Sequence, residues 1–224
     1  IAGLAGAGRS ELLETIFGIA KKKSGTVTVH GRRADNRSSR QAIQNGFALL
    51  TEERRATGIF GILDIIANTT ISNLKNYRSG GIFLSSSKMK SDTMWAVRSM
   101  KIKTPSLKTK IRTLSGGNQQ KVVLSKWLAS DAEILIFDEP TSSLNDEEAK
   151  GLFEIIHRLA SQGIGIFYIS HKMEEIFEIG DQITVLRDGQ YIKSCKKEGI
   201  DRGGLISLMV GRKIEFDSLA NPVQ

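Results

Sequence analysis

The sequence contains one cysteine and three prolines, and aromatic residues make up only 6% of its 224 positions. A single cysteine, Cys195, permits no internal disulfide and supplies no thiolate cluster for a metal. No apolar run reaches the roughly 18 residues of a membrane-spanning helix, so we expect the chain not to cross a bilayer itself. The first residues, IAGLAGAGRS, lack the basic and apolar regions of a secretion signal. These absences favour a cytosolic protein.

Basic residues outnumber acidic ones, 32 to 24, which gives a net charge of +8. Such an excess is typical of proteins that bind nucleic acid, anionic membranes or phosphate-bearing small molecules. Here the basic residues gather at 21–23, 32–40 and 54–55 without interleaved aromatic side chains. A solvated basic face accounts for this pattern, and we expect no nucleic-acid partner.

Apolar stretches of strand length alternate with segments of helical period. The expected strands are 26–30, 47–50, 134–137, 164–169, 183–186 and 190–193, and the expected helices are 9–17, 115–128, 145–162 and 205–210. Residues 64–100 have the pattern of a mostly helical insertion. Near-continuous apolar strands joined by helices predict an α/β fold, with a mostly parallel sheet flanked by helices.

The segment GLAGAGRS, residues 3–10, matches the phosphate-loop pattern G-x-x-x-x-G-K-[ST] except at Arg9. Glycines let successive backbone amides point at a phosphate, and the helix that follows adds its positive end. Ser10 stands where the hydroxyl usually holds Mg²⁺. Arg9 keeps the charge of the usual lysine, but its planar fork is longer and wider. Taken alone, the segment also fits a glycine-rich turn that caps a helix.

Two acidic residues, Asp138 and Glu139, directly follow the buried strand at 134–137. Open α/β sheets bind ligands at the carboxyl ends of their strands. Asp138 is therefore a candidate Mg²⁺ ligand, and Glu139 a candidate general base that polarises the attacking water. The strand at 164–169 delivers His171 to the same edge, as a candidate contact for the γ-phosphate and the water. Alternatively, Asp138 and Glu139 only cap the next helix, and His171 has a structural role.

A third segment, LSGGNQQK at 114–121, opens a helix. Ser115 is a candidate N-cap, and Gly116 and Gly117 leave the amides of the first turn open to an anion. By itself this is only a helix cap. The segment is informative because a hydrophobic strand that leads into Asp138 and Glu139 follows it at short range.

The order of these motifs resembles that of ATP-binding cassettes, specifically the sugar-import ATPases for galactose/methylgalactoside, ribose and xylose. The resemblance is carried by GLAGAGRS, TEERR, LSGGNQQK, ILIFDEPTSSL, YISHKMEEIF and DQITVLRDGQ, and it runs through essentially the whole chain. It implies a P-loop NTPase fold, the nucleotide-binding domain of an ABC cassette, over residues 1–213. This domain would carry a helical signature subdomain at about 64–128, and a tail would follow at 214–224. ATP and Mg²⁺ are the implied cofactors.

The resemblance also implies roles for individual residues. Glu139 and His171 would be catalytic, and Ser10 and Asp138 would hold Mg²⁺. The implied nucleotide-binding residues are Gly3, Gly6, Ala7, Gly8, Arg9, Ser10, Glu11, Glu52, Ser115, Gly116 and Gly117. Two cassettes would pair head to tail, so that the last three of these serve the nucleotide bound by the partner.

The implied function is ATP hydrolysis that drives the import of a monosaccharide. The implied partners are a second cassette, a membrane permease and, indirectly, a periplasmic sugar-binding protein. The chain would lie peripherally on the cytoplasmic face of the inner membrane. Two alternatives remain: a catalytically weak cassette that offers its signature to a partner's ATP site, and a non-transport cassette ATPase that binds the ribosome or nucleic acid.

The sequence departs from the family pattern at several points. It begins inside the phosphate-loop strand, so the expected upstream strands and the aromatic residue that stacks on adenine are missing. Arg9 and Glu52 stand where lysine and glutamine are usual, as in the second cassette of two-cassette sugar ATPases, whereas residues 141–213 resemble the first. We therefore hypothesise a hybrid of the two cassettes, joined at the DEPT segment. Asn145 replaces the usual aspartate of the D-loop and cannot carry its charge.

Overall fold

The computed structural model describes residues 1–52, 54–79, 83–129, 132–142 and 144–211. The chain divides into two compact units, one formed by residues 1–12 with the chain from Tyr168 onward, the other by residues 13–167. Helix α1 (Arg9–Ile16) and strand β7 (Gly165–Ile169) each run across this division. The tail expected at 214–224 lies outside the described residues.

In the first unit, the backbone at Ala2 lies between two neighbouring segments. Ala2 pairs in parallel with both Ser170 and Val185. The antiparallel strands β8 (Gln182–Arg187) and β9 (Gln190–Lys196) follow helix α7 (Met173–Ile179), and helix α8 (Arg202–Val210) comes last. The buried core of the unit consists of Ala2, Ile176, Ile183, Val185, Leu205 and Met209.

The second unit contains a sheet in which β6 (Ile134–Asp138) lies between β3 (Phe47–Leu50) and β7. β3 and β6 are parallel, with Phe47 opposite Ile134 and Leu50 opposite Phe137. All of β3 is buried, as are Leu135, Ile136 and Phe137 in β6. The continuous apolar runs in the sequence therefore predicted a parallel sheet correctly, because such strands are covered on both faces.

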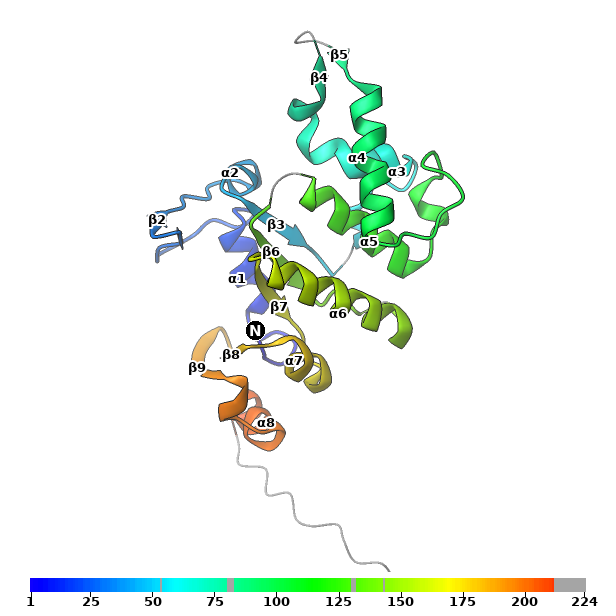
Figure 1. Ribbon diagram of the computed structural model, residues 1–224. Coiled ribbons are helices and arrows are strands. Elements are labelled where there is room, and N and C mark those ends of the chain that lie inside the picture. The colour runs from blue at the N-terminus through cyan, green and yellow to red at the C-terminus, as the bar shows by residue number, and fades with distance from the viewer. Residues whose placement is uncertain (53, 80–82, 130–131, 143, 212–224) are drawn as a thin grey trace, which may run out of the picture. The chain divides into compact units, whose positions relative to one another are not determined.

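Helices gather beside this sheet in the same unit (Figure 1). They are α3 (Ile65–Thr70), a 3-10 segment (Ile71–Tyr77), α4 (Ser86–Ser99) and α5 (Gly116–Leu128), with the hairpin β4 (Arg78–Ser79) and β5 (Phe83–Leu84) between the second and third of these. Helix α5 packs against α3, α4 and β3, and against α6 (Asp146–Ser161). The Trp127 ring meets the edge of Phe17, just beyond α1, with ring centroids 6.2 Å apart. Helix α5 is thus the central helix of the second unit.

Two local features differ from the expectation. The strand expected at 26–30 is reduced to β1 (Thr28–Val29), because His30 and Gly31 have left-handed φ values of 50° and 73° and turn the chain into β2 (Arg32–Arg33). Helix α2 (Ser39–Gln44) was not expected, since only Ala42 in it is buried and no apolar stripe marks it.

The helix expected after Asn145 is confirmed. The Asn145 side chain and the Glu148 backbone form a capping box, and Leu152, Ile155, Ile156 and Leu159 face inward. Among the residues that the structure describes, no helix is long and apolar enough to span a bilayer.

Candidate functional site

The glycine-rich segment at residues 3–10 begins directly after Ala2, whose backbone is paired on both sides in the first unit. The Ala2 amide donates to the Thr184 carbonyl at 2.8 Å, and the Ala2 carbonyl accepts from the Leu186 amide at 2.9 Å. The chain then turns and enters α1 at Arg9. A paired residue, a glycine loop and a helix N-terminus therefore follow one another, and the loop before a helix N-terminus is the local arrangement that phosphate loops use.

Backbone geometry explains why glycines occupy this loop. Gly6 and Gly8 have φ values of 78° and 80°, a region that side chains disfavour. A Cβ atom on Gly8 would lie 3.1 Å from Gly189 Cα, and one on Gly3 would lie 2.6 Å from the Leu186 carbonyl oxygen. The Ala7 carbonyl also accepts from the Gly189 amide at 3.2 Å. The loop is shaped by its own glycines and by the turn between β8 and β9.

The side chains of the loop differ in exposure. Leu4, Ala5 and Gly6 are exposed, Ser10 is half-buried, and Arg9 is only 7% exposed. The Arg9 Cδ would lie 3.1 Å from a Cβ on Gly3, so the aliphatic stem of Arg9 lies along the loop. Ala7 is buried and Glu11 is exposed on the first turn of α1. The loop backbone, with Ser10, is therefore the part best placed to meet a phosphate.

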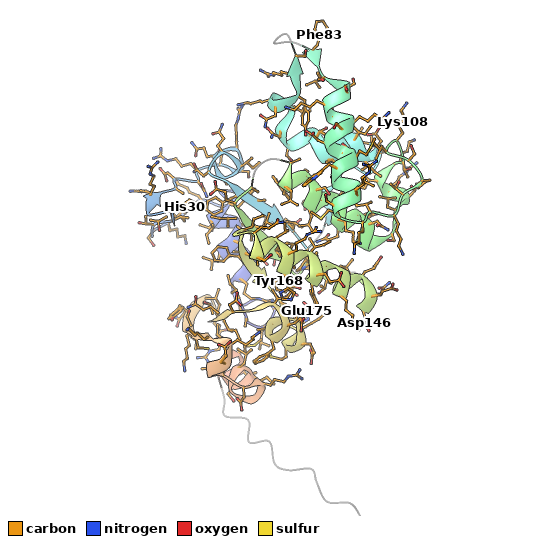
Figure 2. All side chains as sticks on the ribbon, viewed as in Figure 1. His30, Phe83, Lys108, Asp146, Tyr168 and Glu175 are labelled. Atoms are coloured by element: carbon orange, nitrogen blue, oxygen red, sulfur yellow. The ribbon has the colours of Figure 1, made fainter. Side chains whose placement is uncertain are left out.

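His171 follows the end of β7 and is exposed. The residues on both sides of it are fixed by Glu175, which is 5% exposed. One Glu175 oxygen, Oε2, accepts from Ser170 Oγ at 2.8 Å and from the Tyr168 hydroxyl at 2.9 Å, and Lys172 Nζ lies 3.1 Å from Oε1 (Figure 2). A buried carboxylate with these partners holds the backbone that presents His171, and nothing in the local sequence pattern pointed to it.

Asp138 and Glu139 end β6 in the second unit. The parallel register, with Leu50 opposite Phe137, makes these acids emerge at the same sheet edge as Glu52, two residues beyond β3. Asp138 is half-buried, Glu52 is exposed, and Glu139 is 6% exposed. Glu139 has a left-handed φ of 45°, a conformation that costs a residue with a side chain about 1–2 kcal/mol. Backbone strain of this kind is concentrated at functional sites.

Ser115, Gly116 and Gly117 begin α5, as expected. Ser115 Oγ accepts from the Asn118 amide at 3.4 Å and from Asn118 Nδ2 at 3.0 Å. Ser115 is exposed, Gly116 half-buried and Gly117 buried. The Gly117 amide donates to Glu148 Oε1 at 3.0 Å. Glu148 is also the capping-box residue of α6, and nothing in the sequence pattern indicated its contact with α5.

Lys126, in the last turn of α5, is a second residue that the sequence did not single out. It is 7% exposed, and its Nζ donates to the Gly58 carbonyl at 2.8 Å and lies 4.7 Å from the centre of the Trp127 ring. Burial lowers the pKa of this lysine from 10.5 to about 8. It ties α5 to the end of the π-helical turn (Arg54–Gly58) that follows Glu52.

Each of the two units carries donor groups of a kind that a magnesium triphosphate uses. Backbone amides around left-handed glycines form concave sites for anions, and the start of α1 adds its dipole. Ser10 and Asp138 offer oxygen ligands of the kind that Mg²⁺ prefers, and Mg²⁺ is usually held by one or two side chains together with substrate phosphates. The first unit carries the loop and His171, and the second carries Glu52, Asp138, Glu139 and Ser115–Gly117.

Known proteins are similar to this chain in sequence. The family model described as ABC transporter matches residues 1–142. The galactose/methyl galactoside import ATP-binding protein MglA of Salmonella typhimurium is 48% identical over 189 residues, which cover 84% of this chain and 37% of that protein, and the Escherichia coli K12 protein of the same name gives the same values. The chain thus spans little more than a third of the length of these relatives.

Solved structures share the fold. A nucleotide-free ATP-binding cassette from an ABC transporter has a TM-score of 0.77 at 18% identity, covering 94% of this chain and 82% of that one. The dimeric cassette MJ0796 bound to ADP and Pi has a TM-score of 0.73 at 19% identity, covering 89% and 84%.

Proposed function

The chain belongs to the ABC transporter family, and we propose that it binds and hydrolyses ATP to energise the import of a monosaccharide of the galactose or methyl galactoside type. The observation that carries the proposal is the loop at residues 3–10, where Gly6 and Gly8 adopt left-handed backbone conformations directly before α1. The 48% identity to galactose/methyl galactoside import ATP-binding proteins supports the sugar class.

Each site residue has a task in this function. The amides of residues 6–10, with the Arg9 charge, bind the phosphates, and Ser10 and Asp138 would hold Mg²⁺, which neutralises phosphate charge. Glu139 accepts a proton from the attacking water. His171, held in place through Glu175, would contact the terminal phosphate and that water. Glu52 follows β3 at the same sheet edge as Asp138 and Glu139.

The partners follow from the same arrangement. A second cassette would pair head to tail with this one, and Ser115, Gly116 and Gly117 would lie at its nucleotide. A membrane permease would dock on the surface that follows Glu52, where Phe60 and Ile62 are 51% and 73% exposed. A periplasmic sugar-binding protein would act through the permease. The chain itself would then lie peripherally at the cytoplasmic face of the inner membrane.

The test is to measure binding and turnover separately. We expect the purified chain, shown to be folded by circular dichroism, to bind ATP and ADP with Mg²⁺. Glu139→Gln should leave ATP affinity close to that of the parent and lower turnover about 10²- to 10⁴-fold, because the variant has no general base. Turnover at the parental rate in Glu139→Gln would show that Glu139 lacks this role, and absence of nucleotide binding by the folded parent would contradict the function itself.

Arg9 favours a second candidate function, a cassette that binds ATP and hydrolyses it slowly. The guanidinium is wider than the usual ammonium, and the residue is nearly buried beside the loop. Comparing Arg9→Lys with the parent separates the two functions. A large gain in ATPase rate in Arg9→Lys would identify the parent as the slow form, whereas an equal or lower rate would favour full activity in the parent.

A further inference from the structure

Glu148 contacts the N-termini of two helices at once. Its Oε2 accepts from the Asn145 amide at 3.5 Å, and its own amide donates to Asn145 Oδ1 at 2.8 Å, which closes the capping box of α6. Its other oxygen, Oε1, accepts from the Gly117 amide in the first turn of α5 at 3.0 Å. A capping box needs only the two contacts with Asn145. The contact with Gly117 joins segments that are 31 residues apart.

With Glu148 in this position, only a glycine fits at 117. A Cβ there would lie 2.8 Å from both Cγ and Cδ of Glu148 and 2.9 Å from Oε1. Gly117 is buried, whereas Ser115 is exposed. The inner side of this turn therefore faces Glu148, and Ser115 is on the side that faces solvent.

Electrostatics favours the contact. The first turn of a helix carries a partial positive charge, and a carboxylate that accepts from a backbone amide there forms a charge-assisted hydrogen bond. The turn is also held from another direction, because Asn118 Oδ1 accepts from the Lys103 amide at 2.8 Å. With Glu148 in place, the start of α5 has one defined orientation relative to α6.

Given the ATPase function proposed above, we propose that Glu148 is a positioning residue: it locks the signature turn at Ser115–Gly117 to the start of α6, so that both meet the partner cassette's nucleotide as one rigid body. Glu148 itself touches no nucleotide. The role it supplies is orientation, which matters because phosphoryl transfer depends mainly on placing charge correctly around the phosphate.

The experiment compares Glu148→Ala and Glu148→Gln with the control Asn145→Ala. Asn145→Ala removes the other half of the capping box and leaves the Glu148 side chain beside Gly117. Two kinds of measurement are made on the full chain. One is amide hydrogen exchange of residues 114–121, and the other is ATPase kinetics, which gives kcat and KM for ATP.

We expect Glu148→Ala to speed exchange in the first turn of α5 about tenfold and to lower kcat by a similar factor, as loss of one charge-assisted hydrogen bond predicts. KM should stay near the parental value, because the chain's own loop binds ATP. Glu148→Gln keeps an acceptor oxygen at the same place, so its exchange in the first turn of α5 and its kcat should be close to the parental values. Asn145→Ala should speed exchange only at the start of α6.

Equal effects of Glu148→Ala and Asn145→Ala on kcat, or unchanged exchange at residues 114–121 in Glu148→Ala, would overturn the proposal. If Glu148→Ala does not fold, Glu148→Gln carries the test. Its exchange at residues 114–121 should be slightly faster than in the parent, because the acceptor oxygen stays and the charge is lost. Exchange that is faster only at the start of α6, as in Asn145→Ala, would overturn the proposal. A folded parent without ATPase activity would contradict the proposed function alone, since the exchange measurement still decides whether Glu148 holds the turn.

Discussion

Gly6 and Gly8 share a left-handed backbone but differ in their surroundings. Nothing lies within 4 Å of a Cβ placed on Gly6, whereas a Cβ on Gly8 would meet the backbone of Gly189 at 3.1 Å. Substitution at Gly6 therefore adds backbone strain, and substitution at Gly8 adds both strain and a collision with a neighbour that has no side chain to move. Gly6 is therefore needed for its backbone conformation alone, whereas Gly8 is needed also because the Gly189 backbone lies close to it.

We predict that Gly6→Ala lowers the free energy of unfolding by about 1 kcal/mol, the usual cost of a left-handed alanine. Gly8→Ala should lower it further and weaken ATP binding more, because the loop must shift away from the turn between β8 and β9. Gly25→Ala is the matched control: its φ is 87°, its Cβ would meet nothing within 4 Å, and it lies outside the loop. Urea unfolding and equilibrium ATP binding measure both effects. Equal losses of stability and of ATP affinity in Gly6→Ala and Gly8→Ala would show that the close contact between Gly8 and Gly189 contributes nothing measurable.

At the scale of elements, α5 is the helix on which the second unit depends. Its first turn is held by Glu148 and its last by Lys126, which donates to the carbonyl at the end of the turn after Glu52. One helix therefore links the signature segment to the segment at the end of β3. A charged lysine at this buried position is costly, and the cost depends on pH.

The lowered pKa of Lys126 predicts a rise in stability with pH. Below about pH 8 the lysine is protonated in both states and the burial cost is fully present. Between about 8 and 10.5 the folded state loses its proton first, so the unfolded state binds more protons and the free energy of unfolding increases. The full increase is about 3 kcal/mol at 1.36 kcal/mol per pKa unit.

Urea unfolding at several pH values between 7 and 10 checks this prediction, with Lys126→Met as the variant. Lys126→Met should lack the part of the rise that comes from Lys126. Burial also lowers the pKa of Lys121, but Lys121 contributes equally to both proteins, so the difference between them isolates Lys126. Parallel pH profiles in parent and variant would contradict the prediction.

At the scale of the whole molecule, exposed apolar side chains are candidate contacts for the proposed permease. Phe60 and Ile62 follow the turn that Lys126 holds, so their surface is joined to α5 through Gly58. Phe83, which is 76% exposed, lies on the β5 hairpin of the same unit, well away from β3 (Figure 2).

We predict that Ile62→Asp in the assembled importer lowers sugar uptake about tenfold, since a charge in the centre of an apolar contact costs more than 1 kcal/mol. ATPase activity of the isolated chain should not change, because Ile62 is not part of the nucleotide site. Phe83→Asp serves as the control and should affect neither quantity. Uptake that falls equally with both substitutions would argue against a permease contact at Ile62.

Prediction from the sequence succeeded for elements whose pattern lies in neighbouring residues. The strands expected at 47–50 and 134–137, the cap at Ser115 and the helix that begins at Asn145 each depend on residues that are close in sequence. Helix α2 and the hairpin of β1 with β2 were missed, because α2 buries one side chain and the hairpin turns at a histidine. The roles of Glu139, His171 and the other site residues stay predictions.

The sequence by itself determined the family, the parallel strands and the glycine loop, because motif spacing, hydrophobic period and backbone preference are properties of neighbouring residues. Tertiary structure alone decided that Glu148 holds Gly117, that Lys126 holds Gly58, and that Glu175 fixes the residues beside His171. The first two contacts join residues 31 and 68 positions apart. The third joins the end of β7 to a buried residue of the next helix. A buried carboxylate is stable only where hydrogen-bond donors take the place of water, and only tertiary packing decides which donors those are.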